Sequence, residues 1–191
     1  SARATIGRVR VEKFALSCHN AFPQVAAGAI AERWLEQKYG VHIVAWVSAV
    51  GSVEASRALE SRKWTRTDID GTLIRCPDTS VASRMEREII AARDDHDSIG
   101  GVVTCAMWNV PRGLGEPCFD KLEAVLGHAM LSIPATKGFE IGSGFAGTQQ
   151  RGSQHNDMFT SGVDGLATAT NNSGGVQGGI SNGQPIIVRV A

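Results

Sequence analysis

The sequence has no long hydrophobic run and no excess of charge of either sign. Nineteen Lys and Arg residues face nineteen Asp and Glu residues, so the formal net charge is zero. A balanced charge provides no long-range attraction to nucleic acid or to an anionic membrane. The longest strongly apolar stretch, residues 41–50, is far shorter than the roughly 20 residues needed to span a bilayer. We therefore expect no nucleic-acid partner and no membrane partner.

Paired cysteines and targeting signals are also lacking. The four cysteines are widely spaced and form no CxxC pair: Cys18, Cys76, Cys105 and Cys118. This spacing argues against a zinc site and a redox motif, and it predicts reduced thiols in a cytoplasmic protein. The sequence contains no signal-peptide pattern. Because the chain opens on Ser1 rather than Met, we expect that its true N-terminus is missing or processed.

The patterns that are present predict alternating helices and strands in one domain of 191 residues. Helices are expected at 26–39, which ends at Gly40, after Pro77 with Asp78 or Ser80 as the cap, and at 119–131. The last of these places Phe119 on its apolar face and Asp120 in its first turn. Strands are expected at 41–50, 101–110, 138–145 and 185–190, with a connection at 52–75. Helices between β segments indicate a mixed helix and sheet domain.

The last third is rich in glycine and poor in charge. Residues 138–183 hold 12 of the 22 glycines, and we count only five charged residues from 138 to 191. Such a segment can be a flexible linker or a set of loops that bring the backbone close to a ligand. The flanking sequences EIGSGF and PIIVRV are strand-like, which favours binding loops.

Residues 171–183, NNSGGVQGGISNG, form the sharpest local motif, which we call the Gly-rich loop. Its two Gly-Gly pairs allow consecutive N–H groups to point one way and form an anion-binding concavity. No GxxxxGK[ST] P-loop and no GxGxxG after a strand is present. The alternative, a Gly-rich hairpin without a ligand, remains open from the residues alone.

A second motif is RGSQHND, residues 151–157. Arg151, His155, Asn156 and Asp157 could together hold an anion or shuttle a proton, although a His beside an Asp is also typical of a surface or capping pair. The other histidines, His19, His42, His96 and His128, show no metal-ligand spacing and no HExxH motif. We therefore predict no metal site and assign structural roles to these four.

Several segments, taken in chain order, resemble chorismate synthase. They are SARATIGRV (1–9), AAGAIAERWL (26–35), IRCPD (74–78), DSIGGVVTC (97–105), GLGEPCFDKLEA (113–124), HAMLSIPATKGFEIGSGF (128–145), GSQHND (152–157) and the Gly-rich loop. Segments such as EPCFDKLEA are more similar to those of the fungal-type enzymes. The resemblance implies an α+β fold, part of a β-α-β sandwich in which helices pack between antiparallel sheets.

The resemblance also implies a function. The family is a lyase of the shikimate pathway, which leads to the aromatic amino acids. It converts 5-enolpyruvylshikimate-3-phosphate, a small-molecule phosphate, to chorismate and phosphate by an anti 1,4-elimination. It requires reduced FMN, with NADPH as the reductant in the fungal bifunctional enzymes, and it assembles as a homotetramer. Carried over residue by residue, the motifs imply flavin contacts at Ser1, Pro134, Ala135 and Gly178. They imply substrate or phosphate contacts at Arg3 and Asn156.

The chain departs from the family pattern in three ways. The segments that bear the family's main catalytic histidines and aspartate would precede Ser1 or follow Ala191, so we predict no catalytic residue within 1–191 and no activity from this stretch alone. Ala4 replaces the Glu of the family's SARET. Sixteen additional residues, 10–25, interrupt an expected helix at Pro23, either as a surface loop or as translated non-coding sequence. A non-catalytic flavin- or phosphate-binding module and a structural remnant remain alternatives to an enzyme segment.

Overall fold

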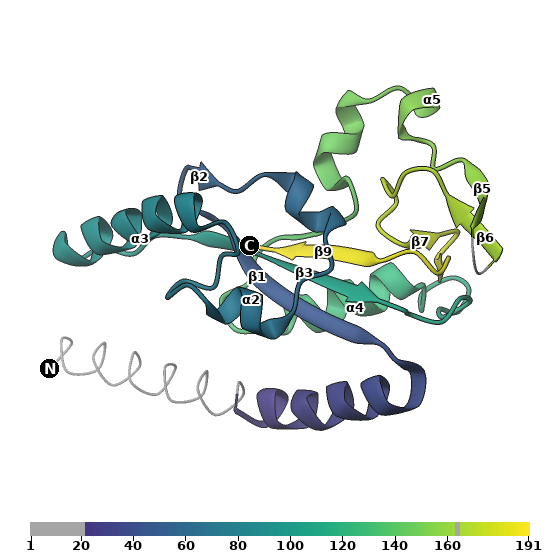
Figure 1. Cartoon of the computed structure of the whole chain (residues 1–191), viewed down its shortest axis with the longest axis horizontal. Helices are drawn as coiled ribbons and strands as arrows, with labels where there is room; N and C mark the ends of the chain where they lie inside the picture. The colour runs from purple at the N-terminus through teal and green to yellow at the C-terminus, as the bar shows by residue number, and fades with distance from the viewer. Residues whose placement is uncertain (1–21, 163–164) are drawn as a thin grey trace, which may run out of the picture.

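A five-stranded antiparallel sheet is the centre of the fold (Figure 1). The computed structural model describes residues 22–162 and 165–191. The sheet has the strand order β2-β1-β3-β9-β4, with bounds β1 His42–Val50, β2 Val53–Glu54, β3 Gly101–Trp108, β4 Phe139–Ile141 and β9 Ile186–Val190. The expected strands at 41–50 and 101–110 are therefore confirmed, and those at 138–145 and 185–190 are confirmed as shorter strands.

One face of the sheet carries an aromatic core. Alternate residues of a strand point to the same face, so Val44 and Trp46 of β1 lie beside Ala106 and Trp108 of β3. The chain between β2 and α3 (Thr79–Asp94) covers this face through η1 (Arg57–Ser61) and α2 (Arg66–Asp70). The side chains that it adds to the cluster are Leu59, Trp64 and Ile69.

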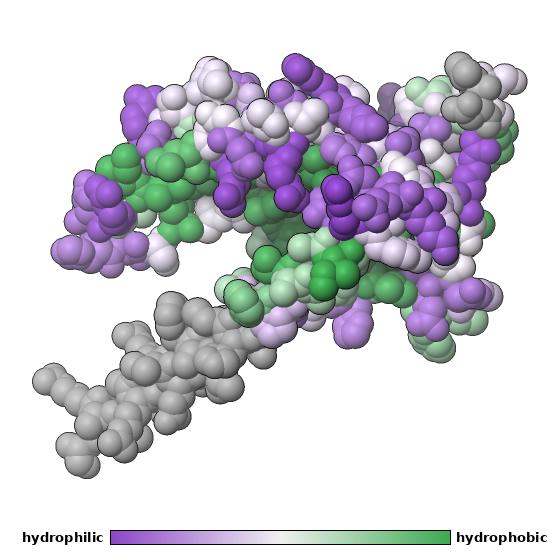
Figure 2. Space-filling model, turned by 60° about the horizontal axis from the view of Figure 1, so that its bottom comes forward, coloured by the Kyte–Doolittle hydropathy of each residue, from purple (hydrophilic) through white to green (hydrophobic). Residues whose placement is uncertain are grey.

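The opposite face packs against α4 (Leu122–Leu131). Val188 is fully buried there, and Leu122 and Leu126 of α4 lie against it and its neighbours. Residues 22–39 are also helical, as expected for 26–39, and Gly40 follows with φ +68. Beside this helix a cavity of about 690 Å³ is lined by side chains that include Leu35 and Ile43. Figure 2 shows apolar surface gathered around a hollow on this side of the molecule.

Helix α3 begins as the sequence predicts. The Asp78 side chain accepts hydrogen bonds from the N–H groups of Ser80 and Val81, which are otherwise unpaired at a helix start. Its buried side chains Ala82 and Met85 pack with a third cluster at the end of β1, formed by Val50, Val53, Ala55 and Cys76. The helix thereby closes the end of the sheet.

Two expectations for local structure were wrong. The helix expected from residue 119 begins at Leu122, because Leu122 N donates to Gly179 O at 2.8 Å and Lys121 is the N-cap. Phe119 is therefore outside the helix and 91% exposed, and Asp120 precedes its first turn. The connection expected at 52–75 contains β2, η1 and α2.

The α+β prediction is confirmed, since helices pack against a sheet whose neighbouring strands all run antiparallel.

The remaining elements lie towards one end of the molecule (Figure 1): η2 Gly144–Gln149, α5 Gly152–His155, β5 Phe159–Gly162, β6 Gly165–Thr168, β7 Val176–Gln177 and β8 Ile180–Ser181. Among the strands that the structure describes, β5 and β6 pair only with each other, as do β7 and β8. None of the helices within 22–162 and 165–191 has the length and apolar character needed to cross a membrane.

Candidate functional site

The second glycine pair forms the tip of a hairpin. Val176 pairs with Ser181 and Gln177 with Ile180, which leaves Gly178 and Gly179 as a two-residue turn between β7 and β8. Both glycines have positive φ, +63 and +87, as a type I′ turn requires. A Cβ built on Gly178 would meet no atom of the described residues within 4 Å, so its backbone is open on that side. The predicted flavin contact at Gly178 therefore lies on an accessible turn, and its role stays a prediction.

The first glycine pair, Gly174–Gly175, is buried, and the backbone of Gly174 packs against the backbone of Gly142. A Cβ on Gly174 would lie 2.3 Å from Gly142 N, and one on Gly142 would lie 2.2 Å from Asn172 O. Neither position tolerates a side chain without movement of the backbone. The pair at 174–175 thus allows the loop to approach the turn between β4 and η2, and the structure leaves it no surface for a ligand.

The N–H groups at the start of the Gly-rich loop surround the carboxylate of Asp157. Asp157 Oδ1 accepts from Thr170 Oγ1 at 2.6 Å and from Asn172 N at 2.7 Å, and Oδ2 accepts from Ser173 N at 2.7 Å. The residue is 2% exposed. The anion-binding concavity is thus formed by the N–H groups of Asn172 and Ser173, not by the two Gly-Gly pairs as expected, and a side chain of the same chain fills it.

These contacts also determine the charge of Asp157. Burial by itself raises the pKa of this carboxyl, but the hydrogen bonds from Thr170, Ser173 and Asn172 outweigh burial and hold the pKa below its ordinary value. Asp157 is therefore ionised at neutral pH and acts only as an acceptor. It is not suited to the proton shuttle that the sequence left open.

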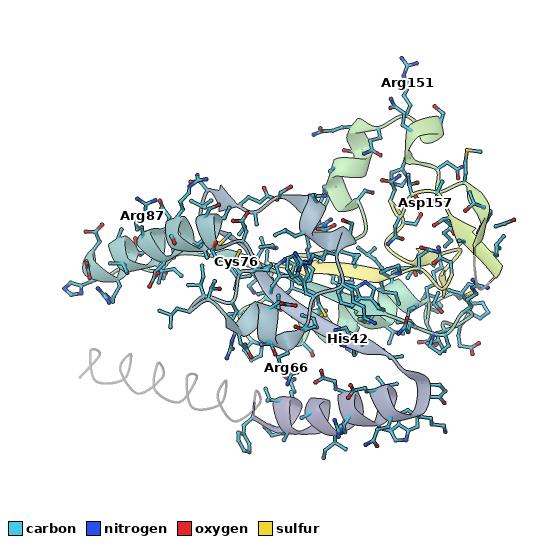
Figure 3. The ribbon with its side chains drawn as sticks, viewed as in Figure 1. His42, Arg66, Cys76, Arg87, Arg151 and Asp157 are labelled. Atoms are coloured by element: carbon cyan, nitrogen blue, oxygen red, sulfur yellow. The ribbon has the colours of Figure 1, made fainter. Side chains whose placement is uncertain are left out.

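The other members of the RGSQHND motif do not converge with Asp157. Arg151 points away from the body of the molecule, whereas Asp157 lies inside it (Figure 3). The ring of His155 pairs with Ser143, with Nε2 and Oγ 2.7 Å apart. Asn156 is exposed at the end of α5, where its backbone N–H donates to Gly152 O at 2.9 Å. The sequence named Asn156 as the site residue and missed the positioning contacts of Asp157.

His155 and Ser143 face a cavity of about 490 Å³ at the outer edge of β4. Asn172 lines the same cavity, and its Nδ2 donates to the His155 backbone oxygen at 3.1 Å. Glu123 contributes a carboxylate whose Oε2 is buried without a hydrogen-bond partner among the described residues. The Ser143–His155 pair joins η2 to α5, and Asn172 connects both residues of the pair to the Gly-rich loop.

Pro134 and Ala135 lie in a turn after α4. Thr136 N donates to Ile133 O at 3.3 Å, and Ala135 has φ +68, so the turn presents its backbone in an unusual conformation. The start of α4 contacts the Gly178–Gly179 turn and its end leads to Pro134, so about 15 Å of helix separates the two sets of predicted flavin contacts. A single chain does not bring them together. Ser1 and Arg3 lie outside the described residues.

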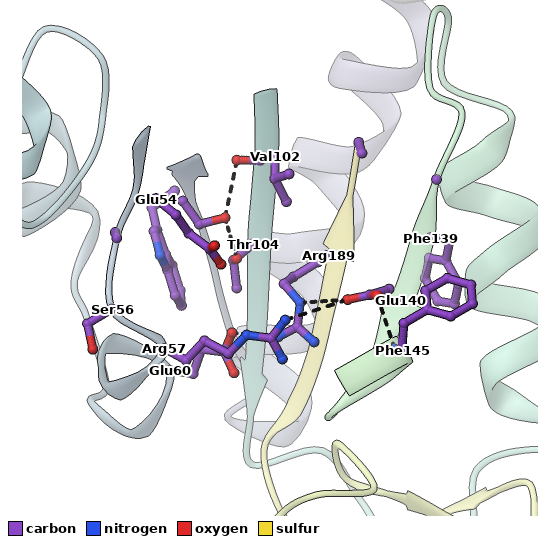
Figure 4. Close-up of a pocket in the computed structure, with 15 residues that line it drawn as sticks. Glu54, Ser56, Arg57, Glu60, Val102, Thr104, Phe139, Glu140, Phe145 and Arg189 are labelled. Atoms are coloured by element: carbon purple, nitrogen blue, oxygen red, sulfur yellow. Dashed lines mark hydrogen bonds and ion pairs between the residues drawn. The ribbon is translucent and has the colours of Figure 1, made fainter. Parts of the chain in front are cut away.

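A charged cluster on the aromatic face holds the turn between β4 and η2 (Figure 4). Arg189, 6% exposed, pairs with Glu60 at 2.6 Å and with Glu140 at 3.2 Å, and it also donates to Gly142 O. Arg57 donates to Ser143 O at 3.3 Å. These groups line a cavity of about 300 Å³ together with Trp46 and Phe145. Glu54 also lines this cavity, so three carboxylates face two guanidinium groups, and the cluster offers no free positive charge for an anion.

The sequence could not identify this cluster, since Arg189 reads as an ordinary polar position in a strand. By contrast, the structure agrees with the roles that the sequence assigned to the thiols and to His42. Cys76, Cys105 and Cys118 are free, and burial raises the pKa of the Cys105 thiol to about 11. His42 Nε2 lies 2.8 Å from Trp64 O, as suits a structural role. In the described part of the chain no three His, Cys, Asp or Glu residues form a group able to hold a metal ion.

Known proteins match this chain along most of its length. The family model described as Chorismate synthase matches residues 12–191. A chorismate synthase of Schizosaccharomyces pombe is 51% identical over 212 residues, which cover 97% of this chain and 50% of the relative. Those of Synechococcus sp. WH7803 and Saccharomyces cerevisiae are each 52% identical, covering 100% of this chain and 48% and 49% of the relatives. The chain thus spans about half the length of the curated relatives it matches.

A crystal structure of chorismate synthase also matches the fold. Its TM-score is 0.81 at 30% identity, and the match covers 87% of this chain and 53% of that one. The yeast relatives confirm the resemblance to fungal enzymes, and the cyanobacterial relative is equally similar. The family match begins within the interval 10–25, and residues 10–21 of that interval lie outside the described residues.

Proposed function

Because this chain belongs to the chorismate synthase family, we propose that its protein converts 5-enolpyruvylshikimate-3-phosphate to chorismate and phosphate by an anti 1,4-elimination. The observation that carries the proposal is the family match along residues 12–191. The activity is proposed for the whole protein, since this chain spans about half the length of its relatives. The chain's own share is to build part of the flavin site.

Reduced FMN is the cofactor that we propose, with backbone contacts at Gly178 of one copy of the chain and at Pro134–Ala135 of another copy, since a single chain does not bring them together. When bound, the reduced flavin assists the loss of phosphate and then of a proton. Two observations support the fit. The Gly178 turn is open, since no atom of residues 22–162 and 165–191 lies within 4 Å of the point where a Cβ would stand, and Ala135 also has a positive φ. Both turns offer fixed backbone dipoles, which suit a developing anion, and the Gly178 turn does so without a side chain in the way.

Binding and orientation, rather than acid–base chemistry, are the proposed tasks of these residues. Asp157 is ionised and fully hydrogen-bonded, and the ring of His155 is paired with Ser143. We propose that the main acid–base groups lie in the segments that the resemblance places before Ser1 and after Ala191. Residues 1–191 alone would then contribute to ligand binding but would not convert 5-enolpyruvylshikimate-3-phosphate to chorismate. Arg3 and the exposed Asn156 are proposed to meet the substrate or its phosphate.

Further parts of the proposal rest on the resemblance to the family. They are assembly as a homotetramer, a cytoplasmic location, and NADPH as the reductant of FMN if the protein shares the bifunctional character of fungal enzymes. The similarity to the yeast relatives supports the last of these. The competing functions are a non-catalytic flavin- or phosphate-binding module and a structural remnant without a ligand.

A turnover assay on the whole protein tests the proposal and separates it from these alternatives. The protein is mixed anaerobically with reduced FMN and 5-enolpyruvylshikimate-3-phosphate, and chorismate and phosphate are measured against a flavin-only blank. We expect equal amounts of both products. Saturable FMN binding without product would favour the binding module, and the absence of both binding and product would favour the remnant. The same assay on residues 1–191 should give no product.

A further inference from the structure

The sequence assigns an external anion to the Gly-rich loop, but the backbone at the start of this loop already binds an anion of the same chain, the carboxylate of Asp157. Two successive backbone N–H groups, at Asn172 and Ser173, and the Thr170 hydroxyl converge on one carboxylate. This arrangement matches the concavities in which proteins bind phosphate and other anions. Here the acceptor is Asp157, which is 2% exposed and lies 13 to 16 residues before its donors in the sequence.

Contacts lead from this carboxylate to the Gly178 turn. Asn172 O accepts from Ser143 N at 2.7 Å, which ties the start of the loop to the end of β4. Asn171 then bridges the loop, because its Oδ1 accepts from Gly175 N and its Nδ2 donates to Pro185 O, each at 2.8 Å. The β7–β8 hairpin continues directly from Gly175. A displacement of residues 172–173 would therefore move the base of the hairpin.

We propose that Asp157 is a positioning residue of the flavin site: its carboxylate takes the place of a bound anion and fixes the shape in which the Gly-rich loop presents Gly178. The inference rests on the proposed flavin contact at Gly178. Asp157 itself touches no ligand and acts through the loop. It follows that the first half of the loop, residues 171–175, does not receive the phosphate of FMN or of the substrate.

Removal of the carboxylate tests this directly, because the vacated donors should accept a small anion from solution. Asp157→Ala and Asp157→Asn are compared with Asp95→Asn, which changes an exposed carboxylate at the end of α3. Amide hydrogen exchange is measured on the whole protein at residues 172–173 and in strand β3, with and without formate. FMN affinity is measured by titration under the same conditions.

In Asp157→Ala we expect exchange at 172–173 to accelerate about tenfold or more and FMN affinity to fall by a similar factor, as for the loss of at least one charge-assisted hydrogen bond. Exchange in β3 should not change. Formate should restore both the loop protection and the affinity of Asp157→Ala. A merely structural loss of stability would instead accelerate exchange throughout the sheet and would not respond to formate.

Other outcomes are equally decisive. If Asp157→Ala fails to fold, Thr170→Val removes one donor to the same carboxylate and should show a smaller acceleration at the same two amides. If Thr170→Val and Asp157→Asn match Asp95→Asn in loop exchange and in FMN affinity, the positioning role is wrong. If formate rescues loop exchange but the parent protein binds no FMN, the role of Asp157 in the loop stands and the proposed flavin function fails.

Discussion

At the scale of single residues, Ala135 has a backbone conformation that suits glycine better. Its φ of +68 lies in the left-handed region, at the third position of a turn closed by Thr136 N and Ile133 O. An L side chain there costs roughly 1–2 kcal/mol. We expect Ala135→Gly to raise the free energy of unfolding by roughly 0.5–1 kcal/mol, after the entropic cost of glycine in the unfolded chain. Urea denaturation measures the difference.

Ala129→Gly provides the matched control, because Ala129 lies in α4 and is exposed. The same exchange of side chains should there lower stability by roughly 1 kcal/mol. Equal losses from the two variants would show that the turn at Ala135 is not strained. If Ala135→Gly gains stability and loses FMN affinity, the strain belongs to the proposed flavin contact.

Asp157 should make folding stability depend on pH. Its folded pKa lies below the ordinary value, so its contribution is complete above the unfolded pKa and is lost as pH falls through the folded pKa. The unfolding free energy of the parent minus that of Asp157→Asn should therefore be constant near neutrality. It should shrink below about pH 4. Chemical denaturation at several pH values measures this difference, and a constant difference down to pH 3 would contradict the assigned hydrogen bonds.

At the scale of elements, periodicity and caps predicted the long helices and central strands from sequence alone. Asp78 lies where a cap was expected, and β1 and β3 fall within the expected apolar runs. The start of α4 could not be predicted, because it depends on Gly179 O, a carbonyl 57 residues further along the chain from Leu122. Short elements such as η1 and α2 are likewise determined by packing against the sheet, through Leu59 and Ile69.

A substitution at Gly178 can be compared with the same substitution at Gly40, which serves as a matched control. Gly178 and Gly40 have similar φ values, +63 and +68, and a Cβ on either meets no atom within 4 Å in the part of the chain that the structure describes. Gly178→Val and Gly40→Val should therefore lose similar stability through backbone strain alone, at least about 1–2 kcal/mol each. Only Gly178→Val should also weaken FMN binding, by about tenfold or more, because its side chain stands where the flavin would contact the backbone.

Circular dichroism establishes that both variants fold, and FMN titration then compares them. Asn182 is a poorer control, since its side chain makes two hydrogen bonds at the base of the hairpin, with Gln177 Oε1 and Gln184 N, each at 2.9 Å. If Gly178→Val binds FMN as tightly as Gly40→Val, the turn serves only to close the hairpin. The open alternative of a hairpin without a ligand would then be correct.

At the scale of the whole molecule, the sequence identified the Gly-rich loop but not the contacts that hold this loop and the neighbouring turn between β4 and η2. The partners of Arg189, Glu60 and Glu140, lie 129 and 49 residues away in the sequence, and Asp157 reaches its donors only after the β5–β6 hairpin. Strand order and such pairings depend on tertiary contacts that local patterns do not encode. Low charge in the last third was the useful signal, because a charged residue in a buried, charge-poor segment must find a partner.

The last prediction concerns the surface of the helix over residues 22–39. Phe22, Ala26, Ile30 and Trp34 recur every four residues on one side of it, and Phe22 and Ile30 are 78% and 74% exposed. Such a stripe is unfavourable in water, so residues 1–191 on their own should self-associate. Light scattering coupled to size exclusion should show a mass that rises with concentration, and Ile30→Lys should reduce it. Leu73→Lys, at a lone apolar side chain 86% exposed in a loop, should not. A monodisperse monomer at every concentration would show that the stripe is tolerated in solution.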